Sequence, residues 1–195
     1  MKKYELTAEF IEKWGKKLFR IKALISFGSV KVGELGGYVE KEDNLAQDGD
    51  AWVYDDAKVY GNAKVYGDAW VYGNAWVCGD AKVYGDAKVF DDAKVYGNAR
   101  VCDNAKVYGD ADYLLIGRIG SRFSFTTFFK NKDKGITVSC GCFLGTIAEF
   151  RAKVTDTHGN NKHAKIYNLA ADMAELQILG EEHFDKLNTN KSEPF

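Results

Sequence analysis

The sequence predicts a mainly β protein in which a long series of short strands lies between a hairpin and a small α+β module. Two observations carry this prediction. Ten consecutive six-residue units begin at Gly49, and each unit has Ala at its third position and Val at its fifth. Before and after this series, the sequence changes to longer patterns that are typical of ordinary strands and helices.

Each unit is predicted to form one short strand and one turn. In a unit such as GDAWVY, Ala and Val alternate with Trp and Tyr, which places the smaller residues on one side of a strand. The next two residues are Gly or Asp, followed by Asp or Asn, and these residues tolerate the left-handed backbone of a tight corner. The apolar residues show no spacing of about 3.6 residues, so the pattern excludes a helix.

The spacing from Val53 to Ala57, repeated in every later unit, resembles the hexapeptide-repeat, left-handed parallel β-helix superfamily. This resemblance implies a triangular coil of three units, with Ala and Val filling the interior. The same phase extends upstream through inward positions at Leu35, Val39, Leu45 and Ala51. We therefore expect the β-helix to span residues 35–112 in about four coils. The resemblance is specific for the fold and does not give a function.

Coils of three units place residues 18 positions apart on one face of the β-helix. The first face then presents six aromatic side chains, Trp52, Tyr54, Trp70, Tyr72, Phe90 and Tyr108. Six exposed rings exceed the apolar area that a monomer normally shows, so this aromatic face is expected to be covered. A homo-oligomer is the first expectation, with a trimer favoured because many members of the superfamily are trimers. The terminal segments and a foreign protein are the alternatives.

The third face carries a basic ladder formed by Lys64, Lys82 and Arg100. Charged side chains along exposed strands commonly prevent association between edges, and this is the simpler interpretation of the ladder. A groove for an anionic ligand is the alternative.

The flanking segments have patterns of their own. Residues 1–34 contain FIEKWGKKLFRIKAL, whose alternating halves around GKK predict a hairpin that caps the first coil. Residues 113–180 are predicted to form an α+β module of three strands and two helices. The strands are expected in YLLIGRIGSR, FSFTTFFKNKDKG and ITVSCGCF. Residues 181–195 are expected to form a flexible tail.

The helices of this module have recognisable ends. Thr146 and Glu149 have the spacing of a capping box, so a first helix is expected to start there and to end near Thr157. The segment KHAKIYNLAADMAELQI predicts a second helix, and Gly180 is its expected stop.

Composition limits the classes of function. The chain has 195 residues, a formal net charge of -1 and no apolar run of membrane-spanning length, so we expect a cytoplasmic protein that binds neither nucleic acid nor membrane. Its four cysteines are too sparse for an oxidised scaffold and are expected to be reduced thiols.

Acyl transfer and metal binding are the two chemistries for which the histidine and cysteine residues are considered. Hexapeptide acyltransferases use a base, usually a histidine of the repeats or of a loop leaving them, but the three histidines here lie downstream of the repeats. An enzymatic role is therefore disfavoured, and no cofactor is expected. A zinc-like set consists of Cys140, Cys142, His158 and His163. The CxC spacing is unusual for structural zinc, and both thiols could simply face a core, so no metal is expected.

The segment GRIGSRFSFTT offers a candidate site for an anion. Backbone N–H groups, hydroxyl groups and a guanidinium suit phosphate or carboxylate oxygens. The candidate ligand-binding residues are Gly120, Ser121, Arg122, Thr126 and Thr127. An ordinary polar hairpin turn with a surface arginine is the competing interpretation.

A second resemblance concerns the whole chain. LGGYVEKEDNL, the YGNA and YGDA repeats, and the IGSR, TTF and VSCGCF segments look like a group of proteins carried by bacteriophages and mobile elements. This resemblance implies a non-enzymatic binding protein, involved in countering host defence, that sequesters a nucleotide-like anionic ligand or blocks a host protein. A hexapeptide-type acyltransferase and a structural spacer or virion component are the alternatives.

Overall fold

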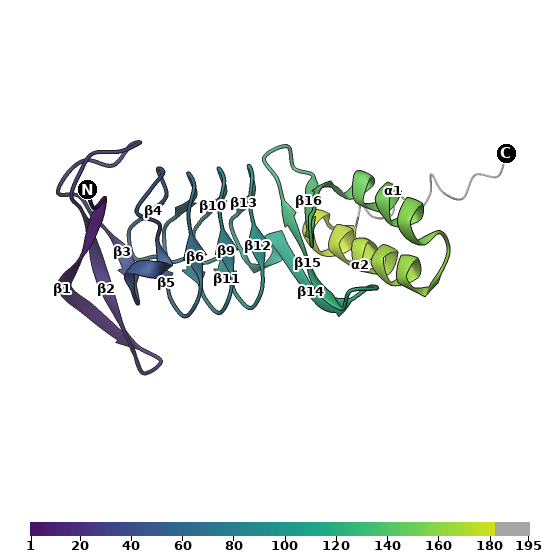
Figure 1. Ribbon diagram of the computed structural model, residues 1–195, viewed down its shortest axis with the longest axis horizontal. Helices are drawn as coiled ribbons and strands as arrows, with labels where there is room; N and C mark the ends of the chain where they lie inside the picture. Colours follow the sequence, from purple (N-terminus) through teal and green to yellow (C-terminus); the bar gives the residue numbers. More distant parts are fainter. Residues whose placement is uncertain (182–195) are drawn as a thin grey trace. The chain divides into compact units, whose positions relative to one another are not determined.

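A computed structural model describes residues 1–181, except for the side chain of Asp110. The chain divides into two compact units, one spanning Met1–Asp110 and the other beginning at Ala111. The first unit is a β-solenoid of about four turns, and the second contains four strands and two helices (Figure 1). The mainly β fold class that the repeats predicted is confirmed.

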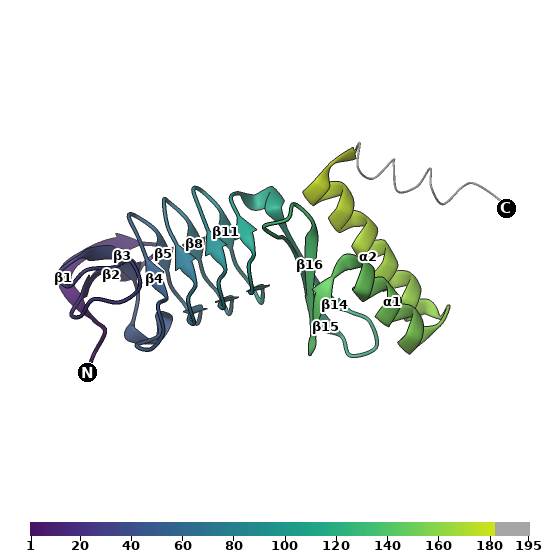
Figure 2. The same cartoon turned by 90° about the horizontal axis from the view of Figure 1, so that it is seen from above.

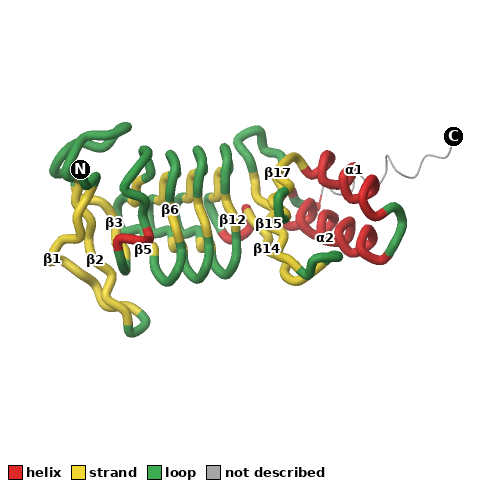
Figure 3. Tube along the Cα trace, in the orientation of Figure 1, coloured by secondary structure: helices red, strands yellow, loops and turns green. Residues whose placement is uncertain are grey.

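Each six-residue unit contributes one strand of two residues, followed by a turn (Figure 3). The strands are β4 Trp52–Val53, β5 Lys58–Val59, β6 Lys64–Val65, β7 Trp70–Val71, β8 Trp76–Val77, β9 Lys82–Val83, β10 Lys88–Val89, β11 Lys94–Val95, β12 Arg100–Val101 and β13 Lys106–Val107. The Val of each strand and the Ala that precedes it are buried. The predicted interior of Ala and Val is therefore confirmed.

Parallel pairing between strands 18 residues apart builds the three faces. The orders are β4-β7-β10-β13 on the first face, β5-β8-β11 on the second and β6-β9-β12 on the third. On the second face, Lys58 pairs with Trp76 and Trp76 pairs with Lys94. Three units per turn follow directly from this register.

The corners between strands require a left-handed backbone. Glycine fills most of these positions, whereas Asp55, Asp91 and Asp103 occupy the equivalent position in three units with φ of 49°, 52° and 54°. Aspartate tolerates this conformation because its short polar side chain can bond to the local backbone. The Gly-to-Asp exchange in the repeat therefore preserves the turn.

An N-terminal hairpin extends the second face. Strands β1 (Tyr4–Lys13) and β2 (Lys16–Ala23) are antiparallel, and β2 pairs with β3 (Leu35–Val39), which in turn pairs in parallel with β5. The predicted hairpin is confirmed. Leu35, expected to point inward, is instead 49% exposed. Gly36 takes the crowded side of β3, where a Cβ would lie 2.5 Å from the Val53 carbonyl oxygen, and the alternation along the strand therefore directs Leu35 to the opposite side.

Side chains satisfy the backbone carbonyls at the open first coil. Lys3 is 2% exposed, and its Nζ donates to the carbonyls of Asp48, Gly49 and Ala51 at 3.0–3.2 Å. Asn44, at the end of a 3-10 turn (η1, Glu42–Asn44), donates through Nδ2 to the carbonyls of Gly61 and Ala63. At these positions, side chains take the place of the backbone N–H donors that a preceding coil supplies elsewhere in the solenoid.

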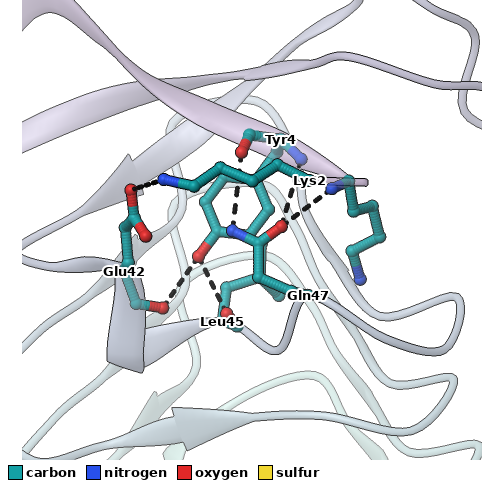
Figure 4. A network of polar contacts seen from close by, with 6 residues as sticks. Lys2, Tyr4, Glu42, Leu45 and Gln47 are labelled. Carbon is teal, nitrogen blue, oxygen red and sulfur yellow. Dashed lines mark hydrogen bonds and ion pairs between the residues drawn. The ribbon is translucent and has the colours of Figure 1, made fainter.

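A network beside Lys3 holds the N-terminal segment in place (Figure 4). The Tyr4 hydroxyl lies 2.8 Å from the carbonyl oxygens of both Glu42 and Leu45, which share its one hydrogen. The Gln47 side-chain oxygen accepts from the backbone N–H groups of Lys3 and Tyr4, and Lys2 forms an ion pair with Glu42. The first four residues are thereby bound to a segment about 40 positions further along the chain.

The second unit contains an antiparallel sheet. Its strands are β14 Tyr113–Ile119, β15 Ser124–Lys130, β16 Ile136–Cys140 and β17 Phe143–Thr146, in the order β14-β15-β16-β17. A short 3-10 turn (η2, Asp110–Asp112) precedes β14. The sequence predicted three strands, with ITVSCGCF as one of them. That segment forms two strands because Gly141 adopts a φ of 62° and reverses the chain.

Two helices lie side by side on the sheet (Figures 1 and 2). Helix α1 spans Ile147–His158 and begins with the predicted capping box of Thr146 and Glu149. Helix α2 spans Lys162–Leu179 and ends at Gly180, as predicted. The core between sheet and helices consists of Phe128, Ile136, Val138, Phe150, Val154, Ala164, Tyr167, Ala170, Ala171, Ala174 and Ile178.

An ion cluster joins the two helices. Arg151 of α1 lies 2.7 Å from both Asp172 and Glu175 of α2.

Within the described residues, no helix combines the length and hydropathy needed to cross a bilayer. The predicted tail from residue 181 onward lies outside the described residues, apart from Glu181.

Partly buried tyrosines on the outside of the solenoid should make it sensitive to high pH. Burial raises the pKa of Tyr60, Tyr72 and Tyr84, to about 12 for Tyr72. A phenol with a higher pKa in the folded state stabilises the fold below its unfolded pKa of about 10, and this contribution is lost as the pH rises further. We expect the free energy of unfolding to fall between about pH 10 and pH 12. Urea titrations followed by tryptophan fluorescence measure it.

The doubly substituted Y72F/Y84F protein is the control for this prediction, since Phe90 already occupies the same column as Tyr72. The control should lose less stability over the same pH interval. Equal losses in the two proteins would contradict the assignment to these phenols.

Candidate ligand-binding pocket in the C-terminal module

A pocket of about 430 Å³ opens in the second unit, within the size range of small-molecule sites. Three segments form its walls, namely the β14–β15 turn, the β16–β17 turn and helix α1, with one residue added by α2. The lining residues are Ser121, Arg122, Ser124, Cys140, Gly141, Cys142, Phe143, Phe150, Lys153, Val154, Thr157, His158 and Tyr167.

The turn from Gly120 to Phe123 carries part of the predicted anion site. Ser121 and Arg122 are exposed and line the pocket. Gly120 is buried with a φ of 72°, and a Cβ at this position would lie 1.8 Å from the Tyr167 hydroxyl oxygen. Glycine is therefore required here both by the backbone conformation and by the close approach of Tyr167.

The two predicted threonines do not join this site. Thr126 and Thr127 are consecutive in β15, so their side chains point to opposite faces of the sheet. Both are buried, and the Thr126 hydroxyl donates to the Cys140 Sγ at 3.2 Å. The structure does not bring these two side chains into the pocket lining, because the alternation along β15 directs them to opposite faces of the sheet, where both are buried.

Tyr167 is the residue of α2 that contributes to the pocket wall. Its ring stacks on His158 with centroids 5.7 Å apart and meets the Phe150 ring edge-on at 5.6 Å. Burial, and then the neighbouring Cys140, raise the pKa of Tyr167 to about 12, while the Arg122 guanidinium opposes this rise. The hydroxyl is thus protonated at neutral pH and lies within the electrostatic reach of Arg122.

The charge of the lining is positive. Arg122 and Lys153 are its two permanent cations, and the described lining residues include no carboxylate. Lys153 forms an exposed ion pair at 3.1 Å with Asp156, one turn further along α1. Exposed pairs of this kind contribute only about 0–1 kcal/mol.

The predicted zinc-like residues are brought close without forming a metal centre. Cys140, Cys142 and His158 all line the pocket, and the His163 ring lies 5.8 Å from the His158 ring. Among residues 1–181, no group of three or more His, Cys, Asp or Glu side chains has the geometry to hold a metal ion. Cys142 is exposed in the β16–β17 turn rather than facing a core with Cys140.

The aromatic face of the solenoid differs from its prediction at one end. Trp52, expected to be exposed, is fully buried because Tyr4 and Phe27 pack edge-on against it at 6.1 and 5.4 Å. Further along the face, the Tyr72, Phe90 and Tyr108 rings contact one another in sequence. The remaining members, Tyr54 and Trp70, are half-buried. The chain therefore covers part of this face with its own N-terminal segment.

The basic ladder has the predicted alignment. Lys64 pairs with Lys82, and Lys82 pairs with Arg100, in one parallel column. A pocket of about 320 Å³ on the solenoid includes Lys64 beside Glu42 and Asp43, so carboxylates accompany the first member of the ladder. A groove for an anionic ligand along this column stays a prediction.

Several residues of the pocket were not predicted from the sequence. Lys153, Phe143 and Tyr167 come from three separate elements, and none belongs to a recognisable motif. The one available signal was Gly120, because a glycine next to a polar turn indicates that another side chain comes close to the backbone. That signal does not identify the side chain that approaches.

Comparison with protein families finds one related repeat. The model of the YdcK beta solenoid repeat matches residues 57–73 and, in an overlapping frame, residues 63–79. Both matches lie inside the solenoid and cover a small part of the chain. These repeats are therefore similar to the YdcK repeat, which supports the solenoid fold. No curated protein matches the chain.

Proposed function

We propose that the protein is a non-enzymatic binding protein whose C-terminal module holds a nucleotide-like anion. The observation that carries this proposal is the pairing of Arg122 and Lys153 with aromatic walls in one pocket of about 430 Å³. A phosphate would accept hydrogen bonds from the guanidinium and from the Ser121 hydroxyl, since charge-assisted bonds of this kind are short and strong. A planar base would contact Phe143 and the apolar lining residues Phe150 and Val154.

Arg122→Ala tests this proposal directly. Nucleoside monophosphates, diphosphates and cyclic nucleotides are titrated into the full chain by calorimetry, with the uncharged nucleoside as the reference ligand. We expect a phosphate-dependent affinity that falls at least about tenfold in the variant, because one charge-assisted hydrogen bond to a phosphate contributes about 1.5–3 kcal/mol. The melting temperature should stay unchanged, since Arg122 is exposed.

Arg118→Ala is the matched control, because Arg118 is also exposed and lies on β14 outside the pocket lining. Its affinity should equal that of the wild-type protein. Binding that survives Arg122→Ala would overturn the site. Stabilisation by acetyl-CoA instead of nucleotides would favour the acyltransferase alternative, and no binding of either ligand would favour a structural spacer.

The biological setting is part of the same proposal. The sequence resemblance to proteins of bacteriophages and mobile elements favours a role in counter-defence, through sequestration of a nucleotide signal or through blocking of a host protein. Small molecules that copurify with the native protein, identified by mass spectrometry, distinguish these two roles. A nucleotide supports sequestration, whereas a ligand-free protein that captures a host protein supports blocking.

A further inference from the structure

Helix α2 carries a row of exposed apolar side chains that no other part of residues 1–181 covers. Ile166, Leu169, Met173 and Leu176 are 39%, 62%, 57% and 46% exposed, respectively. We call these four residues the α2 stripe. Their spacing of three, four and three residues places them in one line along the helix.

The stripe lies on the side of α2 that faces away from the core. At about 100° per residue, its four members centre roughly 150° from the buried Tyr167, Ala171, Ala174 and Ile178. The stripe is therefore a second apolar face rather than the margin of the first. A soluble helix with one core-facing side normally carries polar residues on the opposite side.

We propose that the α2 stripe is the seam of an antiparallel homodimer, in which α2 of one copy packs on α2 of a second copy. Apolar residues at alternating intervals of three and four are the a and d positions of a helix–helix seam with a 3.5-residue period. A two-fold axis requires one surface to complement itself. Antiparallel packing meets this requirement by placing Ile166 beside Leu176 of the other copy and Leu169 beside Met173.

Charge distribution favours the antiparallel orientation. Lys162 and Lys165 lie in the first turn of α2, and Glu181 follows the helix end; all three are exposed. The same register that aligns the stripe places Lys162 of each copy near Glu181 of the other. Antiparallel helices also place the positive end of one helix dipole beside the negative end of the other. A parallel pair would set Lys162 against Lys162.

A lipid surface fits the stripe less well. Lys165 and Asp172 border it on one side, and Gln177 on the other, so the apolar strip is narrow. A membrane-bound amphipathic helix has instead a broad apolar face opposite a strongly basic one. The stripe from Ile166 to Leu176 spans about one and a half heptads and lies within a helix of 18 residues, or about 27 Å.

Sedimentation equilibrium of the full chain tests the dimer. The wild-type protein should sediment as a concentration-dependent dimer, and L169K/M173K as a monomer with half its mass. Lysine keeps a high helix propensity, so the far-ultraviolet circular dichroism spectrum should be unchanged, while the loss of the dimer removes the rise of the melting temperature with protein concentration. L144K is the matched control, because Leu144 is 41% exposed on β17 of the same module, outside the stripe.

A charge exchange tests the orientation. Lys162→Glu should weaken dimerisation about tenfold, and the K162E/E181K protein should restore it. A monomeric wild-type protein, a dimer that persists in L169K/M173K, or a loss in L144K of equal size would overturn the proposal. A K162E defect that Glu181→Lys fails to restore would overturn the antiparallel orientation. Binding of the monomer to vesicles of anionic lipid, abolished by L169K/M173K, would assign the stripe to a membrane.

Discussion

In the Gly120→Ala protein, the C-terminal module should unfold at a much lower denaturant concentration than in the wild-type protein, while the unfolding midpoint of the solenoid should stay the same. The backbone at Gly120 has a φ of 72°, which costs any residue with a Cβ about 1–2 kcal/mol. The new methyl group would also lie 1.8 Å from the Tyr167 hydroxyl oxygen. Tyr167 cannot move aside without disturbing Phe150 and His158, and such overpacking costs about a further 1–3 kcal/mol.

Spectroscopy separates the two units in this experiment. Both α-helices belong to the second unit, so far-ultraviolet circular dichroism follows that unit. All four tryptophans lie in the first unit, so tryptophan fluorescence follows the solenoid. Gly141→Ala is the control, because Gly141 also has a positive φ, but a Cβ added there would extend into open space. Equal destabilisation by both substitutions would contradict the predicted clash with Tyr167.

Lys3→Met should destabilise the solenoid by about 2 kcal/mol. The substitution leaves the carbonyls of Asp48, Gly49 and Ala51 without their donor, and each buried group without a partner costs about 1–3 kcal/mol. Burial of the ammonium group has a cost, which is seen in the pKa of Lys3, lowered to about 8. Methionine removes this cost, and that gain offsets part of the loss of stability. Lys2→Met is the control, since the Lys2 side chain is 59% exposed and its removal should cost less than about 1 kcal/mol.

The pH dependence of this difference is a second measurement on the same pair of proteins. The pKa of Lys3 is about 8 in the folded state, against 10.5 for an unperturbed lysine. Between these values the unfolded chain binds more protons than the folded one, so Lys3 makes the free energy of unfolding rise with pH. The gap in stability between wild type and Lys3→Met should therefore widen from pH 8 to pH 10.5. A gap that stays constant would contradict the buried position of the ammonium group.

The repeat and the helix ends could be predicted because their information is local. Each Val and Ala of the solenoid packs against its own equivalents 18 residues away, so a single period specifies the interior. The capping box of Thr146 and Glu149 closes within one turn of chain. The extra strand β17 was missed because ITVSCGCF alternates in composition throughout, and the reversal depends on Gly141 alone.

The anion site shows where local information stops. Ser121 and Arg122 line the pocket, but Thr126 and Thr127 are buried on opposite faces of the sheet. A turn signal indicates that polar groups are near one another along the chain. It does not indicate that Lys153 and Tyr167, from two helices, complete the walls.

The amino-acid pattern was enough to specify repeated strand-and-turn units, their Ala and Val interior and the two helices that follow, and the resemblance to the hexapeptide-repeat superfamily implied three strands per turn. Only the folded chain decided which outward side chains are covered. Trp52 is buried by Tyr4 and Phe27, the first coil is closed by Lys3 and Asn44, and the α2 stripe is left exposed. The physical reason is that periodicity defines the side of an element on which a residue lies, whereas burial on that side depends on segments that are distant in sequence.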